Sequence, residues 1–354
     1  MNAHTLEKLP RYDPSRSYEW NYAHPPPTVE MDVPPVAGTW SFCGLTVPSP
    51  LGIPAGPLLN GAWLLYYASL GFDVLTYKTV RSSARGCYPL PNLQPVSVAG
   101  MMRGGEGAIP VAPAMQGSWA VSFGMPSKSP DVWRRDVQWT RDQLPREKIL
   151  SVSVVGSVEP GWSIDELAAD YARCAKWAVE SGADCVETNF SCPNVKTCDG
   201  QLYLQADAAR CIAQAVRQAI GRTPYVIKIG HVVDDPAISA LIDAVQPYAN
   251  ALAMTNSVAA TVVDEGSKFL FGGDPRGICG VATRDAALAQ VEHFHRRIAA
   301  EGAELEIIGV GGIGSAQDVR KQLAAGAASV HIATAAMIDP LVGIKIRREL
   351  TSAE

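Results

Sequence analysis

Eight times from residue 51 onward, a short run of apolar residues is followed by a longer stretch with helical periodicity. Short runs without apolar–polar alternation are typical of parallel strands that are buried on both faces. Several helical stretches end at a glycine, which supplies the left-handed residue that closes a helix: Gly71, Gly182, Gly221, Gly302 and Gly326. Eight consecutive strand–helix units predict an α/β protein with a (β/α)8 TIM barrel, and the structural alternative is a doubly wound open sheet.

The element boundaries follow from the same pattern. Strands are predicted at Leu51–Ala55, Phe72–Lys78, Lys148–Val155, Asp184–Phe190, Pro224–Ile229, Asn250–Thr255, Leu305–Val310 and Ala328–Ala333. Helices are predicted at Gly61–Gly71, Pro130–Leu144, Ser163–Ser181, Asp207–Gly221, Asp235–Tyr248, Thr283–Glu301, Ser315–Gly326 and from about Asp339. Because such a barrel carries its active site at the carboxyl ends of its strands, the residues after each strand are the functional candidates.

Residues 1–50 differ from the barrel segment, 51–354. They are rich in proline, tyrosine and tryptophan, include three consecutive prolines at 25–27, and show no sustained helical period. Proline lacks the backbone N–H that a helix interior needs. We therefore expect an extended arm that lies on the barrel, with a possible hairpin at Thr39–Val47 across the barrel's bottom.

Composition excludes several classes of partner. The formal net charge is -5 and no basic block is present, so a nucleic-acid partner is not expected. No apolar run approaches the ~20 residues of a membrane span, and the N-terminus lacks a secretory leader, so the expected location is cytoplasmic. The eight cysteines form no C-x-x-C pair, which argues against zinc and iron–sulfur sites. We interpret all of them except Cys192 as reduced packing thiols.

The seventh predicted strand ends in a glycine-rich segment, Gly309–Gly314, followed by a helix. The G-x-G-x-x-G spacing alone is a weak dinucleotide signal, and the next strand ends without the acid that such a site requires. In a barrel, the loops after strands seven and eight commonly bind phosphate. Gly311, Gly312 and Thr334 are therefore candidates for an anion site, and the alternative is a tight turn that packs against a helix.

The fourth strand ends in Asn189-Phe190-Ser191-Cys192-Pro193-Asn194. Each asparagine offers both a donor and an acceptor, which suits the alternating N–H and C=O groups of a pyrimidine or flavin edge. An exposed thiol near cationic groups can accept a proton. The alternative is an Asx turn with an ordinary cysteine.

Two lysines interrupt strongly apolar strands, Lys78 at the end of the second and Lys228 in the fifth. A buried charge costs several kcal/mol unless it is paired, so each lysine predicts an anionic ligand; the alternative is a side chain that reaches the rim. Other strand ends contribute small or polar groups that face the same mouth: Ala55 and Gly56, Thr79, and Asn256 with Ser257.

Together these residues resemble the dihydroorotate dehydrogenase family, including the FMN half of dihydropyrimidine dehydrogenase, over about residues 40–350. The segment 189–194 is the most specific part, because it is similar to the family's catalytic loop, where cysteine marks the soluble branch. The resemblance implies bound FMN, with Cys192 as the catalytic base and Lys228 beside the flavin. It implies flavin contacts at Ala55, Gly56, Lys78, Thr79, Asn189, Lys228, Gly280, Gly311, Gly312, Ala333 and Thr334. It implies substrate contacts at Lys78, Ser122, Phe123, Gly124, Asn189, Asn194, Asn256 and Ser257.

The chain also departs from the family pattern. The soluble branch has Asn-Ser-x-Gly in the substrate loop after the second strand, and the corresponding segment here is Val121-Ser122-Phe123-Gly124. One polar substrate contact is therefore missing, and the exact substrate stays open. The insertion at 81–115 is unusual, and the paired amphipathic helices of the quinone-using branch are absent from residues 1–50.

The resemblance implies an oxidoreductase of pyrimidine biosynthesis that dehydrogenates dihydroorotate or a related ring. Cys192 would remove a proton, a hydride would pass to flavin N5, and Lys228 would stabilise the reduced flavin. One alternative is a dihydropyrimidine dehydrogenase-like subunit that works with an NAD(P)H and iron–sulfur partner. Another is a non-redox barrel that binds a phosphorylated ligand. We expect a homodimer that acts on a small cyclic substrate, and an electron-transfer partner subunit is a further possibility.

Overall fold

The computed structural model describes residues 9–191 and 201–351. Eight parallel strands close into a barrel in the order β10-β11-β15-β16-β3-β4-β8-β9, which confirms the predicted (β/α)8 barrel and excludes the open sheet. The strands are β3 (Leu51–Ile53), β4 (Val74–Val80), β8 (Ile149–Val154), β9 (Cys185–Asn189), β10 (Tyr225–Lys228), β11 (Ala251–Met254), β15 (Glu306–Val310) and β16 (Ser329–His331). Each contains or overlaps one of the predicted strands.

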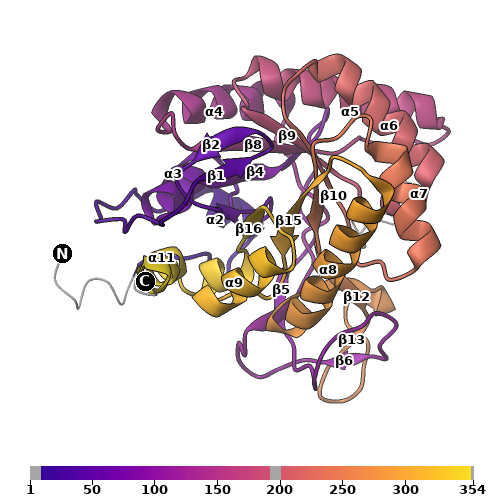
Figure 1. The fold of residues 1–354 in the computed structure, drawn as a ribbon. Coiled ribbons are helices and arrows are strands. Elements are labelled where there is room, and N and C mark those ends of the chain that lie inside the picture. Colours follow the sequence, from indigo (N-terminus) through magenta and orange to yellow (C-terminus); the bar gives the residue numbers. More distant parts are fainter. Residues whose placement is uncertain (1–8, 192–200, 352–354) are drawn as a thin grey trace.

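Helices surround these strands, as Figure 1 shows. They are α3 (Gly61–Ser69), α4 (Pro130–Gln143), α5 (Ile164–Glu180), α6 (Ala206–Ile220), α7 (Asp235–Val245), α8 (Arg284–Glu301), α9 (Ala316–Ala324), α10 (Thr334–Ile338) and α11 (Val342–Thr351). Their ends follow local chemistry. Ser163 and Glu166 form a capping box at the start of α5, and Gly302 adopts the left-handed conformation after α8.

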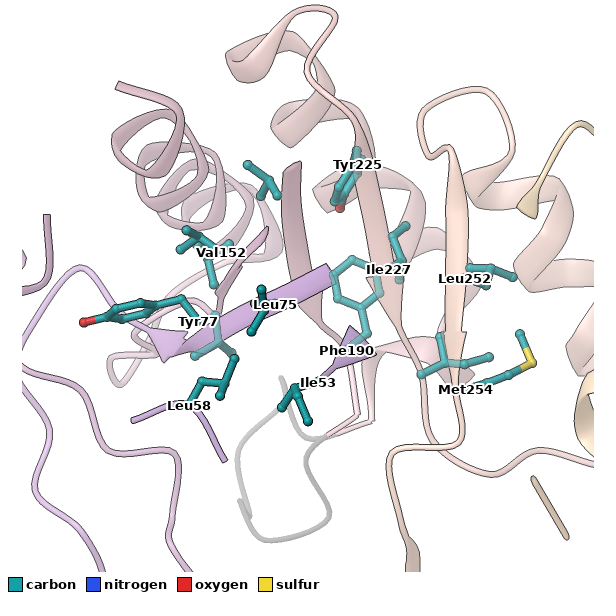
Figure 2. Packing of buried hydrophobic residues seen from close by; sticks show 14 of the residues in the cluster. Ile53, Leu58, Leu75, Tyr77, Val152, Phe190, Tyr225, Ile227, Leu252 and Met254 are labelled. Carbon is teal, nitrogen blue, oxygen red and sulfur yellow. The ribbon is translucent and has the colours of Figure 1, made fainter. Parts of the chain in front are cut away.

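Alternation along the strands divides the apolar residues between two sides of the barrel wall. Leu75, Val152, Ile227 and Leu252 belong to the large cluster that includes helix residues, and Figure 2 shows them along the strands. Their neighbours in sequence, including Val74 and Val226, belong to a smaller cluster made only of strand and hairpin residues. The first set therefore lies between strands and helices, and the second fills the lower barrel interior.

The bottom of the barrel is covered by residues predicted as a hairpin. They form the antiparallel pair β1 (Trp40–Phe42) and β2 (Leu45–Val47). Phe42 joins the interior cluster, and the backbone N–H of Cys43 donates to Glu306 Oε2 at 2.8 Å. Because Glu306 is the first residue of β15, this contact lies at the end of the barrel opposite the predicted site.

The N-terminal arm lies on the barrel but is not wholly extended. It contains the helix α2 (Tyr18–Ala23), which the sequence analysis missed because six residues show too little periodicity. Ser17 caps this helix by accepting from the backbone N–H of Trp20. The hydroxyl of Tyr66 donates to the carbonyl of Pro10 at 2.6 Å, which ties the arm to α3.

The two long loops after β4 and β11 form a lid sheet that the sequence analysis treated as loops. The lid sheet consists of β5 (Leu93–Pro95), β7 (Ser118–Val121), β14 (Arg276–Gly280) and β12 (Val258–Ala260). A second pair, β6 (Ile109–Pro110) and β13 (Val262–Val263), joins the same loops. In Figure 1 the labelled strands β5, β6, β12 and β13 lie together in the lower part of the view. None of the helices in the described part of the chain is long and apolar enough to cross a membrane.

Candidate active site

Lys228 and Ala55 meet at the barrel mouth, as expected for residues that end two strands. Lys228 is 4% exposed, and its Nζ donates to the carbonyl oxygen of Ala55 at 3.2 Å. Gly56 has a φ of +147°, and no atom lies within 4 Å of the position that a Cβ would occupy there. The backbone at 55–56 is therefore open on one side, next to a buried cation.

The predicted residues at the end of β4 are also buried. Lys78 is 7% exposed, and its backbone N–H donates to Leu58 O at 2.9 Å. The hydroxyl of Thr79 lies 3.0 Å from the hydroxyl of Ser153 on the neighbouring strand. The chain therefore holds two buried lysines on the barrel strands, which is the condition under which an anionic ligand is stabilising.

Asn189 and Asn256, predicted to hold a ring, are joined through Ser191. Asn189 Oδ1 accepts from the backbone N–H of Ser191 at 3.1 Å. Asn256 Nδ2 donates to the carbonyl and hydroxyl oxygens of Ser191 at 2.8 and 2.9 Å. Ser191 is 1% exposed, so the chain is fixed at the residue that precedes the predicted catalytic cysteine. Cys192 and Asn194 themselves lie outside the described residues.

The predicted anion site forms one cavity of about 90 Å³. Its lining includes five predicted residues, Gly280, Gly311, Gly312, Ala333 and Thr334. Asn256 lines the same cavity, which therefore reaches the asparagine network. Backbone amides of a glycine segment are suited to bind a phosphate.

The glycines of this cavity are required by packing as well as by the cavity. Gly312 has a φ of +67°, and a Cβ there would lie 2.6 Å from the backbone nitrogen of Arg284 at the start of α8. A Cβ at Gly311 would lie 2.7 Å from the Cβ of Ala287. The geometry therefore agrees with both predictions for this segment, an anion-binding site and a tight turn that packs against a helix.

The predicted substrate loop, residues 121–124, is fixed by contacts with the lid sheet and with the N-terminal arm. Ser122 Oγ accepts from Arg276 Nε at 2.9 Å, so this hydroxyl already has a protein partner. The ring of Phe123 packs edge-on against Tyr12 and Tyr18 of the arm. Gly124 has a φ of +73°, which permits the sharp turn after β7. The side chain of Phe123 thus anchors the arm, while its backbone stays in the loop.

Met125, which follows this loop, is the residue nearest to the asparagine network. It is 6% exposed, and its Sδ lies 3.6 Å from Nδ2 of Asn189. The thioether of Met125 is a weak acceptor, so the amide of Asn189 meets a soft, largely apolar group on this side.

Sequence analysis missed two buried ionisable residues of the barrel interior, Glu187 and His331. Burial raises the pKa of Glu187 above its usual range, and the charge of Lys228 and the hydroxyl of Ser153 oppose that shift. Burial and the charge of Lys228 lower the pKa of His331 to about 3. Both residues interrupt apolar strands, which is the signal that identified Lys228, so the sequence could have identified them.

Metal ligands do not gather in the described residues. No group of three or more His, Cys, Asp and Glu side chains in residues 9–191 and 201–351 is arranged to hold a metal ion.

Comparisons with known proteins point in one direction. Residues 39–353 match the family model described as dihydroorotate dehydrogenase. The dihydroorotate dehydrogenase of Dictyostelium discoideum is 30% identical over 325 residues, which cover 86% of each protein. The catalytic subunit of dihydroorotate dehydrogenase B (NAD(+)) of Desulforudis audaxviator is 28% identical over 313 residues, or 88% of this chain and 90% of that protein.

Solved structures agree on the fold. The dihydroorotate dehydrogenase of Eimeria tenella in complex with ferulenol superimposes with a TM-score of 0.74 at 20% sequence identity. The match covers 94% of this chain and 88% of the other. The ligand-free structure of the same enzyme gives a TM-score of 0.72.

Proposed function

Because the chain belongs to the dihydroorotate dehydrogenase family, whose members are flavin-dependent oxidoreductases acting on CH–CH bonds, we propose that it binds FMN and oxidises dihydroorotate. The observation that carries the proposal is the meeting of Lys228 with Ala55 at the end of the barrel that also holds Asn189, Asn256 and the glycine-lined cavity. The buried cation, the two amides and the glycine-lined cavity are groups that suit the binding of FMN and of a pyrimidine ring.

The residues present fit FMN. The open side of Gly56 leaves room for a flat ring against the backbone, and Lys228 supplies a buried positive charge beside it. Thr255 Oγ1 is buried without a hydrogen-bond partner in the described chain, and the carbonyl oxygen of the same residue lies 3.7 Å from the position that a Cβ of Gly311 would occupy. FMN would be held by Ala55, Gly56, Lys78, Thr79, Asn189, Lys228, Gly280, Gly311, Gly312, Ala333 and Thr334. When bound, FMN supplies the two-electron chemistry that no amino-acid side chain provides.

The asparagines would orient the substrate ring. Asn189 and Asn256 are both anchored on Ser191, which reduces the entropy lost when they bind a ligand. Asn194, Ser257 and Lys78 complete the proposed substrate set, with backbone groups of Ser122, Phe123 and Gly124 closing the far side. An amide matches the donor and acceptor pattern of a pyrimidine edge, and a lysine matches a carboxylate.

Cys192 would act as the base, removing a proton from the substrate carbon while the ring is held. The support for this role is its place directly after Ser191, whose N–H and carbonyl are both fixed by the asparagines. Lys228 would stabilise negative charge on the cofactor, because a buried cation acts strongly in a medium of low dielectric constant.

The proposal includes a homodimer that works in the cytoplasm. The relatives differ in the electron acceptor that their names give. One is named an NAD(+) enzyme subunit, and another, from Limosilactobacillus reuteri, a fumarate enzyme. An experiment is therefore needed to identify the acceptor of this chain. Turnover with dihydroorotate plus fumarate, in the absence of any other protein, would identify an acceptor that needs no partner subunit.

The direct test is anaerobic reduction of the purified, FMN-loaded protein. Dihydroorotate is expected to bleach the visible flavin absorbance, and dihydrouracil, which lacks the carboxylate, is expected to leave it unchanged. Bleaching by dihydrouracil alone would instead support a dihydropyrimidine dehydrogenase-like enzyme. A protein that takes up no FMN contradicts the proposal and supports a barrel for a different phosphorylated ligand.

A further inference from the structure

The barrel interior below the proposed flavin site carries a buried carboxyl group, that of Glu187. Glu187 is 2% exposed, and its Oε1 has no hydrogen-bond partner among the described residues. A barrel interior is normally filled by branched apolar side chains, and an unpaired buried carboxylate costs several kcal/mol. A carboxyl group in this position therefore needs a physical reason.

Strand register places Glu187 one layer below Lys228. Glu187 pairs with Val226 across β9 and β10, while Lys228 pairs with Asn189 two residues nearer the mouth. Cys185 and Val226 belong to the interior cluster, so alternation also turns Glu187 and Lys228 inward. The two charged groups face the same interior without forming an ion pair within 4.0 Å in the described chain.

The positive charge of Lys228 acts on several titratable groups of the barrel interior. It acts on the buried side chains of Glu187 and His331 and on the partly buried thiol of Cys279. The hydrogen bond to Ala55 O directs its Nζ toward the mouth rather than toward Glu187. The positive charge of Lys228 therefore lies between the carboxyl group of Glu187 below it and the proposed ligand position at the mouth above it.

We propose that Glu187 is a positioning residue that sets, through Lys228, how strongly the barrel mouth stabilises negative charge on a bound cofactor. When Glu187 is ionised it neutralises part of the Lys228 charge, and when it is protonated the full charge faces the mouth. This inference rests on the proposed function, because it takes the cofactor to be FMN. Glu187 would then influence the midpoint potential of the flavin and the dependence of that potential on pH.

Other groups around Glu187 determine how the pH dependence is read. The charged or titratable side chains of the barrel interior include Lys78 on β4, Lys228 on β10, Cys279 on β14 and His331 on β16. Two further thiols, Cys185 on β9 and Cys43 of the hairpin, lie in the interior cluster below Glu187. Burial raises the pKa of Cys279 to about 12 and lowers that of His331 to about 3, so both stay neutral near pH 7. Burial raises the pKa of Glu187 above its usual range, while Lys228 and the hydroxyl of Ser153 oppose that shift. The charge of Glu187 is therefore followed from the difference between the wild type and Glu187→Gln, which keeps the other groups in place.

The test compares the FMN midpoint potential of the wild type and of Glu187→Gln across pH. At high pH the substitution removes a negative charge, so the variant is expected to favour reduced over oxidised flavin by about tenfold, which is about 30 mV for a two-electron couple. At low pH the two proteins are expected to converge, because protonated glutamate resembles glutamine. Equal potentials at every pH, or an offset that does not change with pH, would overturn the proposal.

A matched control is Glu306→Gln, the same chemical change at the opposite end of the barrel. It is expected to leave the potential unchanged at every pH. Should Glu187→Gln fail to fold, the wild-type holoenzyme labelled with ¹³C-glutamate decides the question. Its reduced-minus-oxidised infrared spectrum is expected to gain a labelled carboxylic-acid band, and the absence of that band contradicts the proposal.

The apoprotein separates this inference from the proposed function. Because the folded-state pKa of Glu187 is raised, its contribution to stability is present at low pH and is lost as pH rises through that pKa. Glu187→Gln is therefore expected to abolish part of the wild-type loss of unfolding free energy with rising pH. A protein that binds no FMN but shows this difference contradicts the proposed function alone, and identical apoprotein profiles contradict the assignment to Glu187.

Discussion

Asn256 on the loop after β11 donates from Nδ2 to both the carbonyl and the hydroxyl oxygen of Ser191, at 2.8 and 2.9 Å. The two residues are 65 positions apart in the chain and come from strands on either side of β10. Since Ser191 is also held by Asn189, the two amides and the start of the proposed catalytic loop form one network. A substitution in either asparagine is therefore expected to affect the position of Ser191 as well as the binding of a ligand.

Asn256→Ala is expected to lower the unfolding free energy by about 1–3 kcal/mol, because it leaves the buried carbonyl of Ser191 unsatisfied. It is also expected to raise the KM for dihydroorotate, since one ring-binding amide is lost. Urea denaturation and steady-state kinetics measure the two effects. Ser191→Ala, which removes only the hydroxyl, should cost about 0.5–1.5 kcal/mol. An equal loss in both variants would mean that the carbonyl bond is not the important one.

Cys192→Ser is expected to bind FMN normally and to slow flavin reduction by about 10²–10⁴-fold, the usual contribution of a general base. A free thiol has a pKa near ~8.5 and a serine hydroxyl a far higher one, so the pH profile should move upward in the variant. Stopped-flow absorbance across pH measures both. Cys211→Ser, a thiol on the outer helix α6, is the control with a wild-type profile. Unchanged reduction in Cys192→Ser would remove Cys192 from the base role.

Gly312→Ala is expected to weaken FMN binding at least tenfold and to destabilise the protein. The new Cβ would lie 2.5 Å from Arg284 Cβ, and the φ of +67° disfavours any residue with a side chain. Gly314→Ala is the matched control in the same cavity lining, because its nearest contact would be at 3.4 Å without a positive φ. Fluorescence titration with FMN compares them. Equal affinities would show that this turn is not part of the cofactor site.

His331 is expected to make stability fall in acid. Its folded-state pKa is about 3 against an ordinary value of 6.5, so the stability it contributes is present above pH 6.5 and is lost as pH falls below that value. The unfolded chain then binds a proton that the folded chain does not, which costs about 1.4 kcal/mol per pH unit. Denaturation of His331→Phe should show a shallower acid loss than the wild type. An NMR titration in which the His331 ring protonates near pH 6.5 would contradict this account.

The barrel and most of its mouth could be predicted because they depend on local patterns. Unalternating apolar strands followed by helices specify the order of the units, and strand ends converge wherever a barrel closes. Lys228 and Ala55 could therefore be assigned to one mouth although 173 positions separate them. The glycine segment and Thr334 reach one cavity for the same reason.

The lid sheet and the contacts of the arm could not be predicted, because they depend on tertiary packing. Strands of two to five residues such as β6 and β14 pair with segments from a distant loop, and their own sequences carry little periodicity. Phe123 stays a predicted substrate contact, and the packing of its ring against Tyr12 and Tyr18 depends on an arm whose position no local pattern reveals. Glu187 was overlooked although it interrupts an apolar strand in the same way as Lys228.

The most direct measurement is a crystal structure of the protein with FMN and orotate. The account predicts the phosphate at Gly311 and Gly312, the flavin ring between Gly56 and Lys228, and orotate held by Asn189 and Asn256. A flavin bound elsewhere, or a phosphate cavity that stays empty while Lys228 contacts no ligand, would contradict it.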